Sequence, residues 1–166
     1  MENYDALLIN VADQTYALPL LQIQEIRGWS PVSPLPDTDP SCLGVINLRG
    51  QVLPVFDARR ILGKAAPEAR PQDVIVVAVL HGKPLGLLVD SVSDIVSIDT
   101  GRISRADEGE AWSSGLVEGI ATVGEKLVPL LALQKLAGNR LPDQDMADQD
   151  MANQTMTALE DMSAAA

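Results

Sequence analysis

The clearest strand–turn–strand signal in the chain is residues 43–57, whose sequence is LGVINLRGQVLPVFD. Two short apolar runs, Leu43–Leu48 and Val52–Phe56, flank the dipeptide Arg49-Gly50. Glycine accepts the positive φ angle that tight hairpin turns require, so the dipeptide marks a two-residue turn. This stretch therefore predicts a β-hairpin.

The remainder of residues 1–138 follows the same pattern, with short runs of Leu, Ile and Val broken by Gly or Pro. Breaks about every eight to twelve residues are typical of barrels and sandwiches. The dipeptide His81-Gly82 predicts a second hairpin turn. The other expected strands are Ala6–Val11, Tyr16–Leu18, Ile23–Gly28, Val74–Leu80, Pro84–Val89, Ser93–Ile98, Leu116–Val123 and Lys126–Pro129. We expect an all-β body with too many strands for one small barrel.

Two short helices are also predicted. The first covers Ala58–Leu62, follows Asp57 as an N-cap and stops at Gly63. The second covers Leu131–Ala137 and stops at Gly138. Neither helix is long enough to organise a helical domain.

Charge and composition exclude several classes of protein. The 166 residues contain 12 Lys+Arg against 23 Asp+Glu, a net charge of −11, which opposes a nucleic-acid binder that tracks phosphates. Aromatic residues make up 3% of the chain, too few for base-stacking platforms. The acidic start and the absence of a long apolar run indicate a soluble, cytoplasmic protein without direct membrane insertion.

The last part of the sequence, residues 139–166, differs in composition from the rest. It repeats DQDMA, contains no glycine or aromatic residue, and has Arg140 as its single basic residue among several acids. Such a segment buries too little apolar surface to offset the entropy of ordering it. We therefore expect a domain over residues 1–138 and an acidic, disordered tail over 139–166, which is either a regulatory or receptor-contacting segment or a solubilising extension grown by repeat slippage.

The usual catalytic constellations are missing from the sequence. The single histidine, His81, falls in an expected turn, and the single cysteine, Cys42, has no basic partner beside it. Asp90, Asp94 and Asp99 are too spread for a calcium loop, so we interpret them as turn or edge carboxylates. We expect no enzyme activity, no catalytic residue, no metal and no cofactor.

Four landmarks, taken in order over about residues 4–138, resemble the CheW family of bacterial chemotaxis coupling proteins. One is the 43–57 stretch with its Asn-Leu-Arg-Gly core. The others are Tyr16-Ala17-Leu18-Pro19 with Ile23-Gln24-Glu25-Ile26, Leu85-Gly86-Leu87-Leu88-Val89-Asp90-Ser91-Val92, and Gly119-Ile120-Ala121 with Leu127-Val128-Pro129-Leu130-Leu131.

The resemblance implies two small, intertwined SH3-like β-barrels packed on a shared hydrophobic core. It also implies a non-catalytic adaptor that bridges the regulatory domain of a CheA-type histidine kinase and the cytoplasmic tips of methyl-accepting chemoreceptors, with receptor arrays as its location. Flagellar chemotaxis, twitching motility and surface sensing remain open as pathways. Alternatives from other classes are a small-barrel nucleic-acid-binding protein and a hydrolase with an unrecognised site.

The landmarks also suggest a partner-binding surface. Glu25 and Arg49 are charges inside apolar stretches, and the planar fork of arginine suits a partner's carboxylate or carbonyls. Gly44 allows either a close backbone approach or a bulge in its own strand. Ile23 and Val74 are either an exposed apolar centre or core residues. The expected partner-binding set is Ile23, Glu25, Gly44, Asn47, Arg49, Gly50 and Val74.

Overall fold

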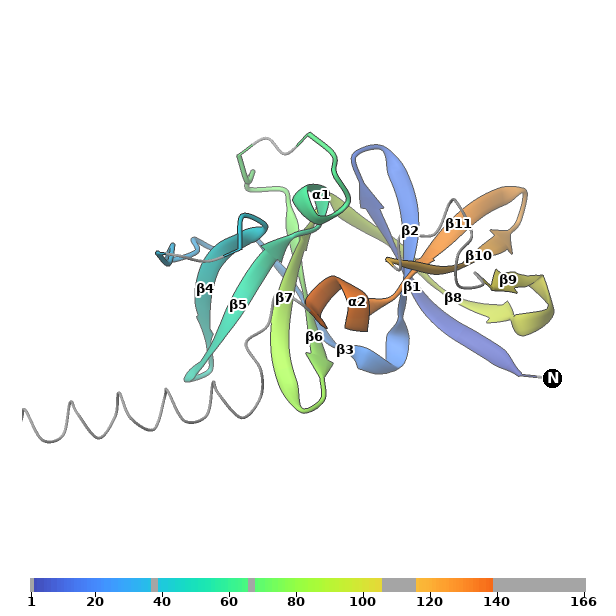
Figure 1. The fold of residues 1–166 in the computed structure, drawn as a ribbon, viewed down its shortest axis with the longest axis horizontal. Coiled ribbons are helices and arrows are strands. Elements are labelled where there is room, and N and C mark those ends of the chain that lie inside the picture. The colour runs from blue at the N-terminus through green and yellow to red at the C-terminus, as the bar shows by residue number, and fades with distance from the viewer. Residues whose placement is uncertain (1, 37–38, 66–67, 106–115, 139–166) are drawn as a thin grey trace, which may run out of the picture. The chain divides into compact units, whose positions relative to one another are not determined.

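Residues 2–36, 39–65, 68–105 and 116–138 are described by a computed structural model of the chain. Residues 1–136 form one compact unit, separate from the remainder. The described residues contain eleven strands in two sheets, six in one and five in the other (Figure 1). The tail expected over 139–166 lies outside the described residues. Within the described part, no helix is both long and apolar enough to cross a membrane.

The first barrel is built from both ends of the compact unit. Its six-stranded sheet has the order β8-β1-β2-β11-β10-β9. The edge strands β8 and β9 are joined by the short 3-10 turn η2 (Thr100–Arg102), so the sheet curls back on itself. The strands are β1 (Asn3–Val11), β2 (Gln14–Pro19), β8 (Ser91–Asp99), β9 (Ile103–Arg105), β10 (Val117–Val123) and β11 (Lys126–Leu131).

The second barrel is inserted between β2 and β8 of the first. The 3-10 turn η1 (Leu20–Gln22) leads into it, and its five-stranded sheet has the order β3-β6-β7-β5-β4. The edge strand β4 pairs through Val45 with Ser33, in the segment that follows the opposite edge strand β3. Its strands are β3 (Ile23–Gly28), β4 (Cys42–Leu48), β5 (Gln51–Asp57), β6 (Val74–Leu80) and β7 (Lys83–Val89).

Each barrel has its own apolar interior, and the two share a third buried layer. In β1, Ala6 and Leu8 belong to the first interior, yet Leu7 on the opposite face is also fully buried. In β6, Ile75 and Val77 belong to the second interior, yet Val76 behind them is also fully buried. Strands buried on both faces are continuous apolar runs. Strand β1 contacts β7, and η1 contacts both β1 and β6, so these outward faces lie toward the region shared by the two barrels.

The predicted turns and the first helix are confirmed. Arg49 and Gly50 have φ angles of 54° and 86°, and His81 and Gly82 have 49° and 76°, as a two-residue hairpin requires. Asp57 caps α1 (Ala58–Ile61), accepting a hydrogen bond from the Arg59 backbone N–H.

Three details of the prediction were wrong. The short strand β9 was missed, because three residues carry too little pattern to detect. Strand β11 continues to Leu131, so α2 (Leu133–Gly138) starts two residues later than expected. The turn at Ala12 and Asp13, with φ angles of 50° and 66°, was also missed since it contains no glycine.

Candidate partner-binding site

Edge strand β3 carries the first half of the site. Glu25 pairs with Val77 and Arg27 pairs with Ile75 across the antiparallel ladder, so both side chains share the face of the second barrel's interior. A bulge lies between Ile23 and Glu25, and bulges often re-aim side chains near functional sites. At this open edge the carboxylate of Glu25 is 21% exposed.

The hairpin between β4 and β5 carries the second half. Arg49 Nη2 lies 3.0 Å from Glu25 Oε2, although the Arg49 side chain is 76% exposed. Arg27 Nη1 lies 4.0 Å from the other oxygen, Glu25 Oε1. Since β3 and β4 are the two edges of the five-stranded sheet, this ion pair links the edges across the barrel opening.

Asn47 and Gly50 shape the turn that presents Arg49. The Gly50 N–H donates to Asn47 Oδ1 at 2.9 Å, an Asx-type contact that closes the turn. Arg49 itself holds the positive φ angle of a hairpin position. The chain therefore fixes the backbone beneath an arginine whose side chain remains exposed.

Gly44 faces a backbone segment of the same chain. Its φ is 140°, and a Cβ built there would lie 2.1 Å from the Ser33 carbonyl oxygen. The Ser33 and Val45 backbones exchange hydrogen bonds of 2.9 Å. The register also shifts between Cys42 and Gly44, as expected of a bulge. Both structural roles considered for this glycine occur together, so glycine is required here by the fold.

Ile23 and Val74 lie on the other face of the sheet. Ile23 pairs with Ala78 and Val74 pairs with Gly28, which places both side chains on the face opposite Glu25. Both are half-buried, and Ile26 on the same face is exposed. The structure thus brings Glu25, Arg49, Asn47 and Gly50 together, and leaves Ile23 and Val74 behind the edge strand.

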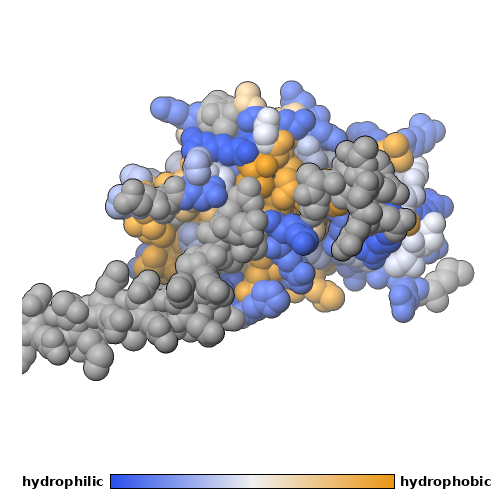
Figure 2. All heavy atoms as spheres, in the orientation of Figure 1, coloured by the Kyte–Doolittle hydropathy of each residue, from blue (hydrophilic) through white to orange (hydrophobic). Residues whose placement is uncertain are grey.

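Apolar side chains also reach the surface near the hairpin. In Figure 2 hydrophobic residues gather over the β4–β5 region and between the barrels, with hydrophilic residues around them. Val52, which pairs with Asn47 beside the turn, is 59% exposed. The arginine turn is therefore flanked by apolar surface, a combination common in protein–protein contacts.

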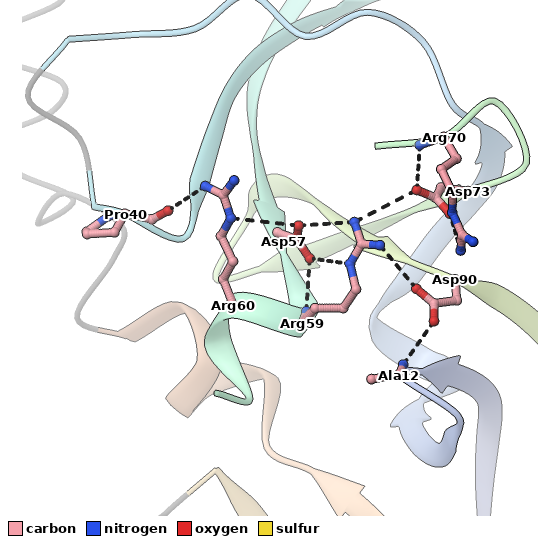
Figure 3. Close-up of polar contacts among 8 residues, drawn as sticks. All are labelled: Ala12, Pro40, Asp57, Arg59, Arg60, Arg70, Asp73 and Asp90. Carbon is pink, nitrogen blue, oxygen red and sulfur yellow. Dashed lines mark hydrogen bonds and ion pairs between the residues drawn. The ribbon is translucent and has the colours of Figure 1, made fainter. Parts of the chain in front are cut away.

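The sequence did not predict a buried cluster of charged side chains around Arg59. The Arg59 side chain is 2% exposed and lies among the carboxylates of Asp57, Asp73 and Asp90 (Figure 3). Burial alone lowers the pKa of the Arg59 guanidinium, but the hydrogen bond to Asp57 and the three negative charges outweigh burial and raise it. Asp90, interpreted above as a turn or edge carboxylate, is part of this cluster. The signal that could have found it is Arg59 two residues after the helix cap Asp57, close enough to pair with it.

Two shallow depressions are lined by described residues. One, of about 280 Å³, lies beside Pro19, Leu21 and Leu131. The other, of about 360 Å³, lies beside Asp99 and Arg102. Neither is lined by histidine or cysteine. Among the described residues no group of three or more His, Cys, Asp or Glu side chains is placed to hold a metal ion.

Comparison with known families decides the classification. A model of the CheW-like domain matches residues 5–140. The chain belongs to the CheW-like family. It is 34% identical over 133 residues to the chemotaxis protein CheW of Rhizobium meliloti, covering 80% of this chain and 86% of that protein. It is 27% identical over 128 residues to the protein FrzA of Myxococcus xanthus, covering 76% and 80% respectively.

A solved CheW-like structure shares the fold. The scaffolding protein TtCheW from Thermoanaerobacter tengcongensis matches with a TM-score of 0.75 at 25% identity, covering 81% of this chain and 92% of that one. The expected pair of SH3-like barrels is thereby confirmed, and the chain is a chemotaxis coupling protein of the CheW-like family.

Proposed function

We propose that this CheW-like chain is a non-catalytic adaptor that joins the regulatory domain of a CheA-type histidine kinase to the cytoplasmic tips of methyl-accepting chemoreceptors. The names of its relatives, which are chemotaxis and scaffolding proteins, support this role. The adaptor would act in the cytoplasm and reach membrane-bound arrays through its partners. It would use no metal, cofactor or nucleic acid.

The observation that carries the proposal is the ion pair between the half-buried Glu25 and the exposed Arg49. An arginine that is largely solvated contributes little to folding, so its ordered placement above a fixed turn suits contact with a partner. Arg27 adds a second positive charge beside one glutamate, in a protein whose net charge is −11. This local excess of positive charge favours an acidic group on the partner.

The other residues of the proposed set support this contact in different ways. Asn47 and Gly50 shape the arginine turn, and Gly44 keeps β4 against Ser33. Ile23 and Val74 offer half-buried apolar surface on the second face of β3. A partner that wraps the edge strand would therefore touch charge on one face and apolar surface on the other.

Titration calorimetry with the purified kinase regulatory domain and a receptor-tip fragment tests the proposal. Transient signalling interfaces bury less than about 1,200 Å² in total, so we expect micromolar affinity. Arg49→Glu places two like charges together and presents the wrong sign to an acidic partner. Losing a desolvated interfacial charge costs about 2–5 kcal/mol of binding, so affinity for at least one partner should fall roughly thirtyfold or more.

Arg105→Glu is the matched control. Arg105 is likewise an exposed arginine, 4.0 Å from Glu118, but it lies on the first barrel. Its substitution should leave both affinities near those of the unaltered chain. Unchanged affinity of Arg49→Glu for both partners would refute a binding role for Arg49. If titration with the kinase domain and with the receptor tip gives no binding heat at any salt concentration, the adaptor function is wrong. Binding heat on titration with an oligonucleotide would favour the small-barrel nucleic-acid-binding alternative.

A further inference from the structure

The chain crosses between the two barrels twice, each time through a short connection. After β2, the chain enters the second barrel through η1, and it returns to the first barrel between β7 and β8. Strand β7 ends at Val89 and β8 begins at Ser91, so Asp90 alone forms the return crossing. Any change in the relative orientation of the barrels must alter the backbone at these two crossings.

The first barrel holds Asp90 through its β1–β2 turn. The Ala12 N–H donates to Asp90 Oδ2 at 2.9 Å, and the Asp90 N–H donates to the Asn10 carbonyl at 3.0 Å. Ala12 is one of the turn residues with a positive φ angle. The Asp90 side chain thus stabilises a turn that has no glycine.

The second barrel holds the same carboxylate through Arg59. Arg59 Nη1 lies 3.5 Å from Asp90 Oδ1, the oxygen that Ala12 does not use (Figure 3). Both Arg59 Nη1 and Asp90 Oδ1 are buried, and neither has a hydrogen-bond partner. If the barrels moved apart here, two buried charged atoms would lose the interaction that compensates them.

Arg59 is itself anchored firmly to the second barrel. It donates to Asp57 through Nε at 3.1 Å and through Nη2 at 3.2 Å, a two-point contact. Its Nη2 also lies 3.8 Å from Asp73 Oδ2, and Asp73 is held in turn by the backbone and side chain of Arg70. The guanidinium therefore has little freedom to follow Asp90 if the crossing shifts.

The two kinds of contact between the barrels differ in directionality. The shared apolar core holds the barrels together, but apolar burial is non-directional and tolerates small rotations. A planar guanidinium fixed at two points defines both distance and angle. Because Asp57 holds this guanidinium at two points, its 3.5 Å ion pair with Asp90 adds a fixed charged point to the non-directional contact of the core.

We propose that Arg59 and Asp90 form an inter-barrel clamp that fixes the relative orientation of the two barrels. Arg59 acts as a positioning residue, because its side chain is buried and works through Asp90. The consequence for signalling rests on the proposed function: an adaptor with two partners needs its binding surfaces in a fixed relation. The clamp itself is a property of the fold.

A distance measurement tests the clamp in the full chain. Cys42→Ser removes the single cysteine, and new cysteines at Gln51 in the second barrel and Lys126 in the first accept spin labels. Asp90→Asn keeps an oxygen for Ala12 but removes the charge that faces Arg59. We expect a single narrow distance distribution in the parent chain and a visibly broader one in Asp90→Asn.

Asp94→Asn provides the matched control on the same strand. Asp94 is exposed, and its Oδ1 accepts a hydrogen bond from the adjacent Ile95 N–H. This control should keep the narrow distribution, and Asp90→Glu, which restores the charge, should stay narrower than Asp90→Asn. A distance distribution in Asp90→Asn as narrow as that of the control overturns the clamp.

If Asp90→Asn does not fold, Arg59→Lys replaces it. A lysine paired with Asp57 lacks the second arm that reaches Asp90, so we expect a broad distance distribution in this variant too. A narrow distribution in Arg59→Lys also overturns the clamp.

Binding measurements then test the consequence. Asp90→Asn should change the affinity for each partner alone by less than about twofold, but lower assembly with both partners together by about tenfold, because simultaneous engagement depends on geometry. Unchanged three-component assembly, with a broadened distance distribution, would overturn the positioning role. If the parent chain binds neither partner, the proposed function fails, and the distance measurement still decides the clamp.

Discussion

Arg49 and Arg59 lie in the same short stretch of sequence and each pairs with a carboxylate, at 3.0 Å and 3.1 Å respectively. Their surroundings differ. The Arg49 side chain is 76% exposed at the tip of the β4–β5 hairpin, whereas Arg59 is 2% exposed among three aspartates. In water the interaction between two charges is weak, and in a protein interior it is far stronger but costs desolvation.

The comparison teaches that distance alone does not reveal what an ion pair does. Breaking the Glu25–Arg49 pair lowers the stability of the fold only slightly, so Arg49 can contact a partner without unfolding the protein. The Arg59 cluster is costly to open, so it belongs to the architecture that holds the barrels. Of two arginines in one short stretch, Arg49 is thus proposed to bind a partner and Arg59 to position the barrels.

Arg59→Met should produce the largest loss of stability. It removes the buried guanidinium that Asp57, Asp73 and Asp90 share, and breaking a buried pair by removing one partner costs about 3–5 kcal/mol. A denaturant melt measures the free energy of unfolding. The control is Arg60→Met, since Arg60 is 43% exposed, donates to the Pro40 carbonyl and lies 4.0 Å from Asp57 Oδ2, a longer contact than that of Arg59. Equal stability of the two variants would break the distinction between the arginines.

Gly44→Ala should give the second largest effect. The new Cβ would overlap the Ser33 carbonyl, and the residue would have to hold a positive φ angle. Substitutions at such positions destabilise by more than about 1 kcal/mol. Gly28→Ala on β3 is the control, because nothing lies within 4 Å of its added Cβ. If both variants melt together with the parent, the hairpin does not require glycine at position 44.

Arg49→Ala should change stability by less than about 1 kcal/mol, because exposed ion pairs contribute only about 0.2–1 kcal/mol. The same denaturant melt measures this effect. A collapse of the folded state in this variant would make Arg49 a structural residue, and the contrast with Arg59 would disappear.

The salt dependence of the free energy of unfolding should be the smallest effect, and it should distinguish Arg49 from Arg59 further. At 1 M salt the screening length is about 3 Å, so the stability difference between the parent and Arg49→Ala should shrink toward zero. The difference between the parent and Arg59→Met should persist, since buried pairs are screened much less. Melts of both variants at low and high sodium chloride measure this; equal salt dependence would contradict the assigned environments.

The sequence by itself determined the local structure around each turn. Arg49-Gly50 and His81-Gly82 between apolar runs specified hairpins, and Asp57 before Ala58 specified a helix cap, because these signals depend only on neighbouring residues. The resemblance of the landmarks to the family predicted the pair of barrels, and it singled out Glu25 and Arg49 as expected partner-binding residues. All of this information lies within a few residues of each motif.

Only the tertiary structure decided which side chains meet. The bulge in β3 and the pairing with β6 set Ile23 and Glu25 on opposite faces, and a one-residue shift in register would have exchanged them. Asp90 looked like a surface carboxylate, yet it joins Arg59 and Ala12 across two barrels. Burial and charge pairing arise from segments far apart in the chain, and their contacts exist only once both sheets have closed.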